Sequence, residues 1–222
     1  MKGKLIIIEG IDGSGKATQT KKLVERLRQE GKQVETFSFP RHGQEFFGKL
    51  VDRYLNNEFG DAAELDPHIA SVFYACDRWE AKDMILGWLG SGKTVVLDRY
   101  ATSNMGHQLS KIKNTKEKEE FLAWLDKMEF EVFKIPRPDK VIYIRVAVEK
   151  VIELIKKRAQ KEYIDGRKDG LESNRKHLET TAETYQWICQ KYNYWEKVEC
   201  MKNRELLTVE EIHEKIWEKI KN

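Results

Sequence analysis

The stretch that decides the fold is Leu5-Ile6-Ile7-Ile8-Glu9-Gly10-Ile11-Asp12-Gly13-Ser14-Gly15-Lys16. Its first half is a short apolar run, mostly of β-branched residues, which is typical of a buried strand. Its second half has the spacing of a Walker A loop, two glycines separated by four residues and followed by lysine. Apolar residues at helical spacing follow, Leu23, Val24 and Leu27, and end before Gly31. A loop between a strand and a helix is the context that this motif requires, so the stretch predicts a phosphate-binding loop.

The chemistry of such a loop depends on its backbone. Glycines let the N–H groups turn inward, the following helix adds its positive N-terminal end, and Lys16 can reach the β- and γ-phosphates of a nucleotide. The alternative is a glycine-rich turn that binds nothing, but the spacing and the context together argue against it. The predicted ATP-binding residues are Gly10, Ile11, Asp12, Gly13, Ser14, Gly15, Lys16, Ala17 and Thr18.

One position departs from the motif. Ala17 stands where a Ser or Thr hydroxyl normally contacts Mg²⁺. We therefore expect the nucleotide phosphates, water and an acid, Asp98 or Glu9, to hold magnesium, with Thr18 contacting a nearer phosphate. Mg²⁺ is the predicted cofactor, with ATP as the phosphate donor.

The rest of the chain repeats the order strand, then helix. Such alternation predicts an α/β fold, here a P-loop NTPase fold with a five-stranded parallel sheet flanked by helices. The last helix carries a capping box, Thr208 with Glu211. At 222 residues the chain suits a single domain spanning 1–222. Besides Leu5 to Glu9, the predicted strands are Thr94 to Leu97, Val141 to Val146 and two weaker candidates, Val34 to Phe39 and Val198 to Met201.

Composition excludes several classes of partner. The chain has 40 Lys and Arg against 37 Asp and Glu, and a net charge of +3 provides no large basic field for a nucleic-acid backbone. No apolar run approaches the roughly 18 residues that span a bilayer. Three scattered cysteines, Cys76, Cys189 and Cys200, favour a reducing compartment over a disulfide framework. We expect a cytoplasmic protein with no nucleic-acid or membrane partner.

A second site signal follows the strand Thr94 to Leu97. The strand ends in Asp98-Arg99-Tyr100, which places an acid and an arginine at a carboxyl end of the sheet, where open α/β sheets bind ligands. Arg99 can fork onto an acceptor phosphate, and Asp98 can orient Mg²⁺ or its water. A surface ion pair is the alternative, and the Walker loop makes it the weaker interpretation. Lys16, Asp98 and Arg99 are therefore predicted catalytic residues.

Further short motifs follow the loop in a specific order. They are Phe39-Pro40-Arg41, then Tyr74-Ala75-Cys76-Asp77-Arg78, then Asp98-Arg99-Tyr100 continuing through Ser103-Asn104, and Pro136-Arg137-Pro138-Asp139 ahead of a strand. In this order and spacing the sequence resembles the thymidylate kinase family over nearly the whole chain. The resemblance implies transfer of the γ-phosphate of Mg-ATP to dTMP, giving dTDP and ADP in dTTP biosynthesis. It also implies a homodimer, for which 50–55 and 69–89 are candidate helices.

The resemblance assigns roles at the base of the acceptor. Tyr74 lies four residues before Arg78, so on a helix both share a face, with the ring available to stack on a pyrimidine and the guanidinium to donate to its O4. Asn104 would pair with the base edge through donor and acceptor together. Each residue has a plainer alternative, Tyr74 as core and Arg78 as a helix-surface ion pair.

The resemblance also assigns roles at the sugar and the phosphate. Asp12 would accept a hydrogen bond from the 3′-hydroxyl of the acceptor. Phe39 and Pro40 would wall the base pocket, although Phe39 could instead simply end a strand. Arg41 and Arg99 would hold the acceptor phosphate.

A basic segment at about 156–175 completes the expected site. The loop lacks an arginine between Asp12 and Lys16, and family members of this kind are expected to supply that charge from a lid. We expect Arg158 or Arg167 to close on the transferring phosphoryl group, with Lys161 and Lys168 assisting. A solvated charged loop is the alternative.

Two other functions remain open from sequence alone. One is a kinase of another nucleoside monophosphate (UMP, CMP or dUMP) or of a deoxynucleoside, from which base-edge residues would separate this chain. The other is a non-catalytic ATP-binding regulatory protein, which an acceptor pocket and a lid argue against. His42, His107 and His177 share no ligand spacing, so we expect them at the surface or in a pocket without a metal role.

Overall fold

The computed structural model describes residues 3–161 and 175–221, without the side chains of 158–161. A five-stranded sheet lies at its centre, with the strand order β2-β3-β1-β4-β5. Every pairing in this sheet is parallel, which confirms the predicted α/β class. The strands are β1 (Leu5–Glu9), β2 (Val34–Ser38), β3 (Thr94–Asp98), β4 (Lys140–Arg145) and β5 (Trp195–Glu199).

Strand bounds agree with the sequence pattern to within one residue at each end, except at β5. The central strand β1 has the predicted bounds, and all five of its residues are buried, as expected for a strand covered on both faces. The predicted edge strand Val198 to Met201 instead begins at Trp195 and ends at Glu199. An edge strand needs an apolar pattern on only part of its length, and here only Trp195 and Val198 are buried.

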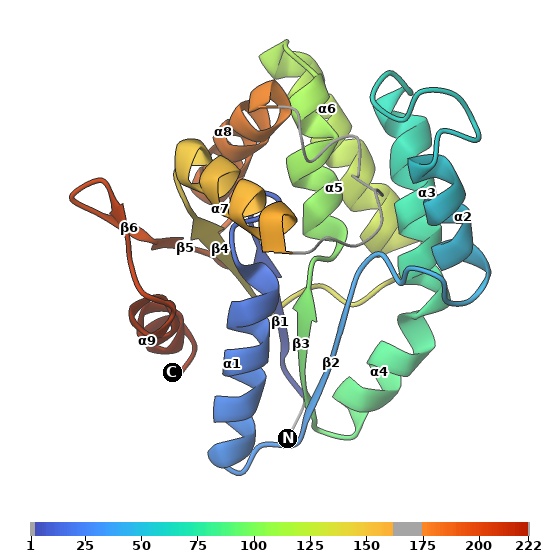
Figure 1. The fold of residues 1–222 in the computed structure, drawn as a ribbon. Helices are drawn as coiled ribbons and strands as arrows, with labels where there is room; N and C mark the ends of the chain where they lie inside the picture. Colours follow the sequence, from blue (N-terminus) through green and yellow to red (C-terminus); the bar gives the residue numbers. More distant parts are fainter. Residues whose placement is uncertain (1–2, 162–174, 222) are drawn as a thin grey trace.

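Helices cover both faces of the sheet (Figure 1). On one face α1 packs against β1, β2 and β3, and α9 packs against α1 and β5. On the other face α5 and α8 pack together, and α8 contacts β4 and β5. The helices are α1 (Lys16–Gln29), α2 (Phe46–Leu55), α3 (Pro67–Glu80), α4 (Lys82–Gly90), α5 (Ala101–His107), α6 (Thr115–Asp126), α7 (Val148–Lys161), α8 (Arg175–Lys191) and α9 (Val209–Ile220).

A local sequence signal explains the start of α9, whereas the boundary between α3 and α4 has no such signal. The capping box of α9 is present, with the Thr208 hydroxyl accepting from Glu211 N and the Glu211 carboxylate accepting from Thr208 N. The predicted stretch 69–89 divides into α3 and α4 at Ala81. A π-helical turn, Lys127–Val132, continues directly from α6.

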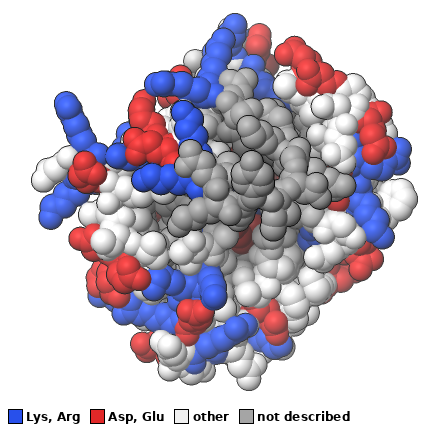
Figure 2. Space-filling view, in the orientation of Figure 1, with Lys and Arg blue, Asp and Glu red and all other residues white. Residues whose placement is uncertain are grey.

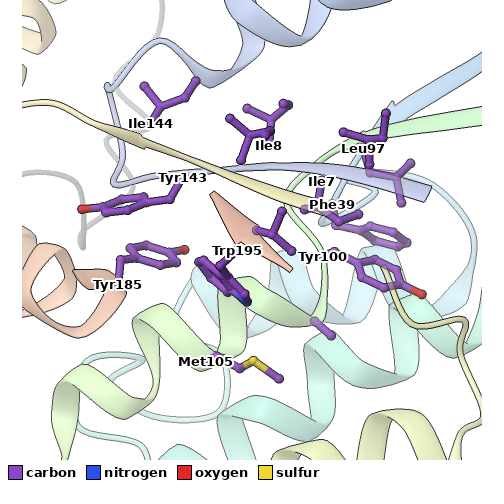
Figure 3. Close-up of a cluster of buried hydrophobic side chains, with 14 of the residues drawn as sticks. Ile7, Ile8, Phe39, Leu97, Tyr100, Met105, Tyr143, Ile144, Tyr185 and Trp195 are labelled. Carbon is purple, nitrogen blue, oxygen red and sulfur yellow. The ribbon is translucent and has the colours of Figure 1, made fainter. Parts of the chain in front are cut away.

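Aromatic side chains fill the core beneath the sheet on the α5 and α8 side (Figure 3). The rings of Tyr143 and Tyr185 stack with centroids 5.1 Å apart. A Cβ at Gly106 would lie 2.2 Å from Cζ of Tyr185, so only glycine lets α5 approach α8 this closely. This packing fixes the position of α5, whose first turn faces the carboxyl ends of β1 and β3.

Charged side chains of both signs are interspersed over the face seen in Figure 2. Within the described part of the chain, no helix has the length and apolar character needed to cross a membrane.

Candidate active site

The phosphate-binding loop joins β1 to α1, as the sequence predicts. Gly13 and Gly15 have φ values of 79° and 89°, a left-handed backbone that residues with a Cβ rarely adopt. Helix α1 begins at Lys16, and the side chains of Ala17 and Thr18 in its first turn are exposed. The loop therefore offers an accessible helix N-terminus to an anion.

Lys16 is buried and folded over the loop. Its ammonium donates to the carbonyl oxygens of Gly10 and Ile11, at 2.9 and 3.0 Å, and lies 4.0 Å from Asp12 Oδ1. A β- or γ-phosphate arriving at the loop would have to draw the ammonium away from these carbonyls.

Beside the loop is a cavity of about 270 Å³ at the carboxyl ends of β2 and β3. It is placed where open parallel sheets bind ligands. The sequence-predicted residues that line it are Asp12, Phe39, Pro40, Tyr74, Arg78, Asp98, Arg99 and Asn104. Its other lining residues are Ser38, His42, Leu55, Tyr100, Ser103, His107, Gln108, Lys111 and His177.

One end of the cavity has a buried polar floor. Arg78 is 2% exposed and donates through Nε and Nη2 to both carboxylate oxygens of Glu129. Asn104 Nδ2 donates to Ser71 O at 3.1 Å and to Glu129 Oε1 at 3.2 Å. Burial acts to lower the pKa of the Arg78 guanidinium, but the charge and hydrogen bonds of Glu129 hold that pKa above its ordinary value. Arg78 thus stays a cation inside the protein.

Aromatic side chains border this floor. Tyr74 is half-buried on α3, and its ring packs edge-on against Tyr54 at 5.8 Å. Phe39 is buried, and its ring lies 5.9 Å from that of Tyr100 (Figure 3). Tyr74 and Phe39 give the cavity apolar walls of the kind that hold a planar base.

Arg99 brings a second positive charge to the cavity lining, next to Asp12 of the phosphate-binding loop. Its Nη2 pairs with Asp12 Oδ1, and its Nη1 lies 2.9 Å from Nε2 of His107. The backbone of Arg99 has φ 68°, an uncommon conformation for a residue with a side chain. This turn directs the guanidinium back toward the phosphate-binding loop.

Arg41, predicted beside Arg99 at the acceptor phosphate, lies elsewhere. It is 8% exposed, and its Nε donates to Asp77 Oδ1 at 2.8 Å while Nη2 donates to Glu80 Oε2 at 2.7 Å. It does not line the cavity. Two carboxylates on α3 hold Arg41 against that helix, and the sequence did not indicate this pairing because the partners are 36 and 39 positions away.

Asp98 suits a role toward a cation. Its Oδ1 is buried and has no hydrogen-bond partner among the described residues. Burial raises the pKa of Asp98 to about 6, with Lys16 acting in the opposite direction and Glu9 adding to the rise. The described residues include no cluster of three or more His, Cys, Asp or Glu that could hold a metal ion. A magnesium ion here would take most of its ligands from phosphate and water. Asp98, whose Oδ1 has no hydrogen-bond partner among the described residues, would supply the protein carboxylate.

Glu9 has a different environment from the one its predicted metal role requires. Its side chain is fully buried, and its carboxylate accepts hydrogen bonds from Tyr100 N and from the hydroxyls of Thr102, Ser103 and Tyr185. These donors occupy both oxygens and leave no exposed face for a cation. Glu9 instead ties β1 to the first turn of α5 and to α8.

Two histidines to which the sequence analysis assigned no role, His107 and His177, lie together in the lining of the cavity. The rings of His107 and His177 stack 5.5 Å apart, and Nδ1 of His107 lies 3.3 Å from Nε2 of His177. Burial, with the nearby charge of Arg99, lowers the pKa of His107 well below its ordinary value. Ser103 and Asn104 lie three to five residues before His107 and Gln108, about one helical turn. This spacing was a sequence signal that His107 shares a helix face with the predicted site residue Asn104.

The predicted lid falls largely outside the described residues. Arg167, Lys168 and the side chains of Arg158 and Lys161 all lie outside the described part of the chain. Arg175 begins α8 and pairs with Glu149 and Glu179.

The chain is similar in sequence and fold to several known proteins. The family model described as thymidylate kinase matches residues 8–216. A thymidylate kinase of Mycobacterium tuberculosis is 35% identical over 159 residues, covering 71% of this chain and 73% of the relative. A human thymidylate kinase is 34% identical over 146 residues, covering 65% of this chain and 62% of the relative.

Two further comparisons span the full length. A protein of Pyrococcus abyssi named "Probable thymidylate kinase" is 31% identical, covering 100% of this chain and 98% of the relative. The solved structure of thymidylate kinase from Candida albicans superposes with a TM-score of 0.73 at 24% identity, covering 99% of this chain and 92% of that one, and shows the same fold. The match of the family model over nearly the whole chain, with these relatives, shows that the chain belongs to the thymidylate kinase family.

Proposed function

We propose that this chain transfers the γ-phosphate of Mg-ATP to dTMP, giving dTDP and ADP for dTTP synthesis. The observation that carries the proposal is the cavity beside the phosphate-binding loop, which is lined by two arginines with different partners. Arg78 supplies the buried cation at the base end, and Arg99 supplies the one next to the loop. A nucleoside monophosphate has the matching shape, with a polar base edge at one end and a phosphate at the other.

The reaction needs positioning and charge stabilisation more than covalent chemistry. Lys16 and the loop amides would bind the donor phosphates, and Arg99 would exchange Asp12 for the acceptor phosphate. Asp12, once released, would be close enough to accept a hydrogen bond from the sugar 3′-hydroxyl. A phosphate oxygen of the acceptor then attacks the γ-phosphorus in line, so no protein nucleophile is required.

Magnesium has a supporting place in this proposal. Asp98 would hold the ion or its water, and the bound ion supplies neutralisation of charge on the donor phosphates. Arg158 or Arg167 would add a further positive charge to the transferring group and help to exclude water.

The experiment is a coupled ADP-release assay with Mg-ATP and a panel of dTMP, dUMP, UMP, CMP, GMP and thymidine. Preference for dTMP is expected. Turnover of another monophosphate alone would leave the phosphate-binding loop in place and reject the base-pocket assignment. ATP binding without turnover of any acceptor would favour the regulatory alternative.

We further propose that residues 1–222 act as one kinase domain, in the cytoplasm and as a homodimer. Support for the dimer comes from apolar side chains along one exposed side of α3, where Ile69, Val72 and Trp79 are 53%, 39% and 47% exposed. Sedimentation equilibrium of the wild-type chain and of Ile69→Glu tests it, with a dimer expected for the first and a monomer for the second.

A further inference from the structure

Glu129 does not line the cavity, yet it contacts both polar side chains at the base end. It is 0% exposed and belongs to the π-helical turn Lys127–Val132. Single π turns inserted after an α-helix occur often at functional sites, because they turn one side chain away from the regular helix face. Here the turned side chain meets Arg78 and Asn104, from α3 and α5.

The first consequence concerns the amide of Asn104. Its nitrogen lies 3.1 Å from Ser71 O and 3.2 Å from Glu129 Oε1. A carbonyl and a carboxylate can only accept hydrogen bonds, so the NH₂ group has to face them and uses both of its hydrogens there. Oδ1 of Asn104 accepts from no described residue and remains as an acceptor toward the cavity.

The second consequence concerns Arg78. A guanidinium has five N–H groups, and Glu129 takes one from Nε and one from Nη2. The remaining N–H groups, including both on Nη1, donate to no side chain in the described part of the protein. The base end of the cavity therefore presents donors from Arg78 beside an acceptor from Asn104.

This order of donor and acceptor distinguishes pyrimidines. Thymine and uracil present O4 as an acceptor next to N3–H as a donor, which complements the pair. Cytosine presents an N4 amino donor next to N3 as an acceptor, which opposes both groups. Discrimination by reversed hydrogen-bond polarity is stronger than discrimination by size, because a mismatched base leaves buried polar groups unpaired.

We propose that Glu129 is a positioning residue that selects thymine or uracil over cytosine by fixing the Asn104 amide and the Arg78 fork. The inference rests on the proposed function and deepens it, since it names the group that sets base selectivity without touching the base.

The experiment compares wild type with Glu129→Gln, for dTMP and dCMP. Glu129 Oε1 accepts from both Arg78 Nη2 and Asn104 Nδ2. In glutamine an NH₂ group that can only donate replaces one carboxylate oxygen, and where it faces Asn104 the amide of Asn104 can turn its own NH₂ toward the base. We expect the ratio of kcat/KM for dTMP to that for dCMP to fall about tenfold. The change should come from a higher KM for dTMP with kcat nearly unchanged, because base contacts act equally in the ground and transition states. KM for ATP should stay at the wild-type value.

Glu199→Gln is the matched control. It removes the carboxylate that pairs with Arg145 at 2.9 Å, at the β4–β5 edge. This variant should keep the wild-type ratio. If Glu129→Gln does not fold by circular dichroism, Glu129→Asp replaces it, because that variant retains the charge opposite Arg78 but is one methylene too short to hold Asn104. The same fall in the ratio is expected.

Other outcomes overturn the inference. A folded variant with the wild-type ratio, or an equal loss with both nucleotides, would show that Glu129 only supports the fold. Titration calorimetry with dTMP and dCMP separates this failure from failure of the proposed function. If wild type binds dTMP without phosphorylating it, the function is rejected and the ratio of the two Kd values still tests Glu129. If wild type binds both equally, the selectivity assigned to Glu129 is rejected, while the ADP-release assay still decides the proposed function.

Discussion

The guanidinium of Arg99 pairs with the carboxylate of Asp12, although the two residues lie 87 positions apart. Asp12 lies within the loop after β1, and Arg99 follows β3 directly. These strands are neighbours in the sheet, so parallel pairing brings their carboxyl ends together. The pair therefore connects the phosphate-binding loop, where the phosphate donor would bind, to the cavity proposed for the acceptor.

Replacing Arg99 tests this connection. In Arg99→Lys the single ammonium cannot fork onto a phosphate, so we expect kcat/KM for dTMP to fall about 100-fold in the ADP-release assay. Arg145→Lys, at an ion pair on the sheet edge, is the control and should keep wild-type activity. Equal activity of both variants would contradict the role of Arg99.

Asp98→Asn should raise stability and lower activity. The pKa of Asp98 is raised by burial to about 6 from an ordinary 3.8, so the ionised carboxyl opposes folding above pH 6. The folded state binds the proton more tightly, hence this cost disappears as pH falls toward 4. The expected gain in the free energy of unfolding for Asp98→Asn is on the order of 2 kcal/mol at pH 8.

Thermal unfolding at pH 8 and pH 4.5 checks this prediction. The melting temperature of Asp98→Asn should exceed that of wild type at pH 8 and approach it at pH 4.5, while ADP release falls. A difference independent of pH would rule out the titration of Asp98 as its cause.

Glu9→Gln should destabilise the fold. The substitution replaces one of two buried acceptor oxygens with an NH₂ group that faces hydroxyls of α5 or α8. We expect a loss of about 1–3 kcal/mol in urea unfolding. Glu35→Gln is a control, because its pair with Lys93 is partly exposed, and it should cost less than about 1 kcal/mol. Similar losses in the two variants would mean that the hydroxyl contacts of Glu9 contribute little.

Gly106→Ala should loosen the α5–α8 contact. Its Cβ would meet the Tyr185 ring at 2.2 Å, and overpacking of this kind costs about 1–3 kcal/mol. Gly87→Ala in α4 is the control, since a Cβ there meets no atom within 4 Å and alanine favours a helix by about 0.5–1 kcal/mol. In denaturant unfolding, Gly106→Ala should therefore lower the free energy of unfolding and Gly87→Ala should raise it. A Gly106→Ala variant as stable as wild type would show that α5 can shift without cost.

The basic segment is tested by Arg158→Ala and Arg167→Ala. If either arginine neutralises charge on the transferring phosphoryl group, its removal should lower kcat by about 100-fold or more with little change in KM for dTMP. Single-turnover kinetics with dTMP measure this directly. Unchanged turnover in both variants would exclude the lid role.

How far the sequence predicted the fold depends on how local each signal was. The strand and loop from Leu5 to Lys16 were predictable because apolar runs and glycine spacing act within a few residues. The start of β5 at Trp195 was not, since two charged residues, Glu196 and Lys197, separate the buried Trp195 from the buried Val198, and it is the pairing with β4 that places all of them in one strand. Similarly, the division at Ala81 has no proline or glycine to mark it.

The site shows the same difference between local and long-range information. The sequence by itself determined which residue types are present, a phosphate-binding loop and arginines in motif order, because motifs are contiguous in the chain. Only the tertiary structure decided which charges meet. It turns Arg41 toward Asp77, surrounds Glu9 with hydroxyl groups, and brings Glu129 beneath Arg78 from 51 positions away. A buried charge requires a partner, and folding rather than sequence spacing chooses it.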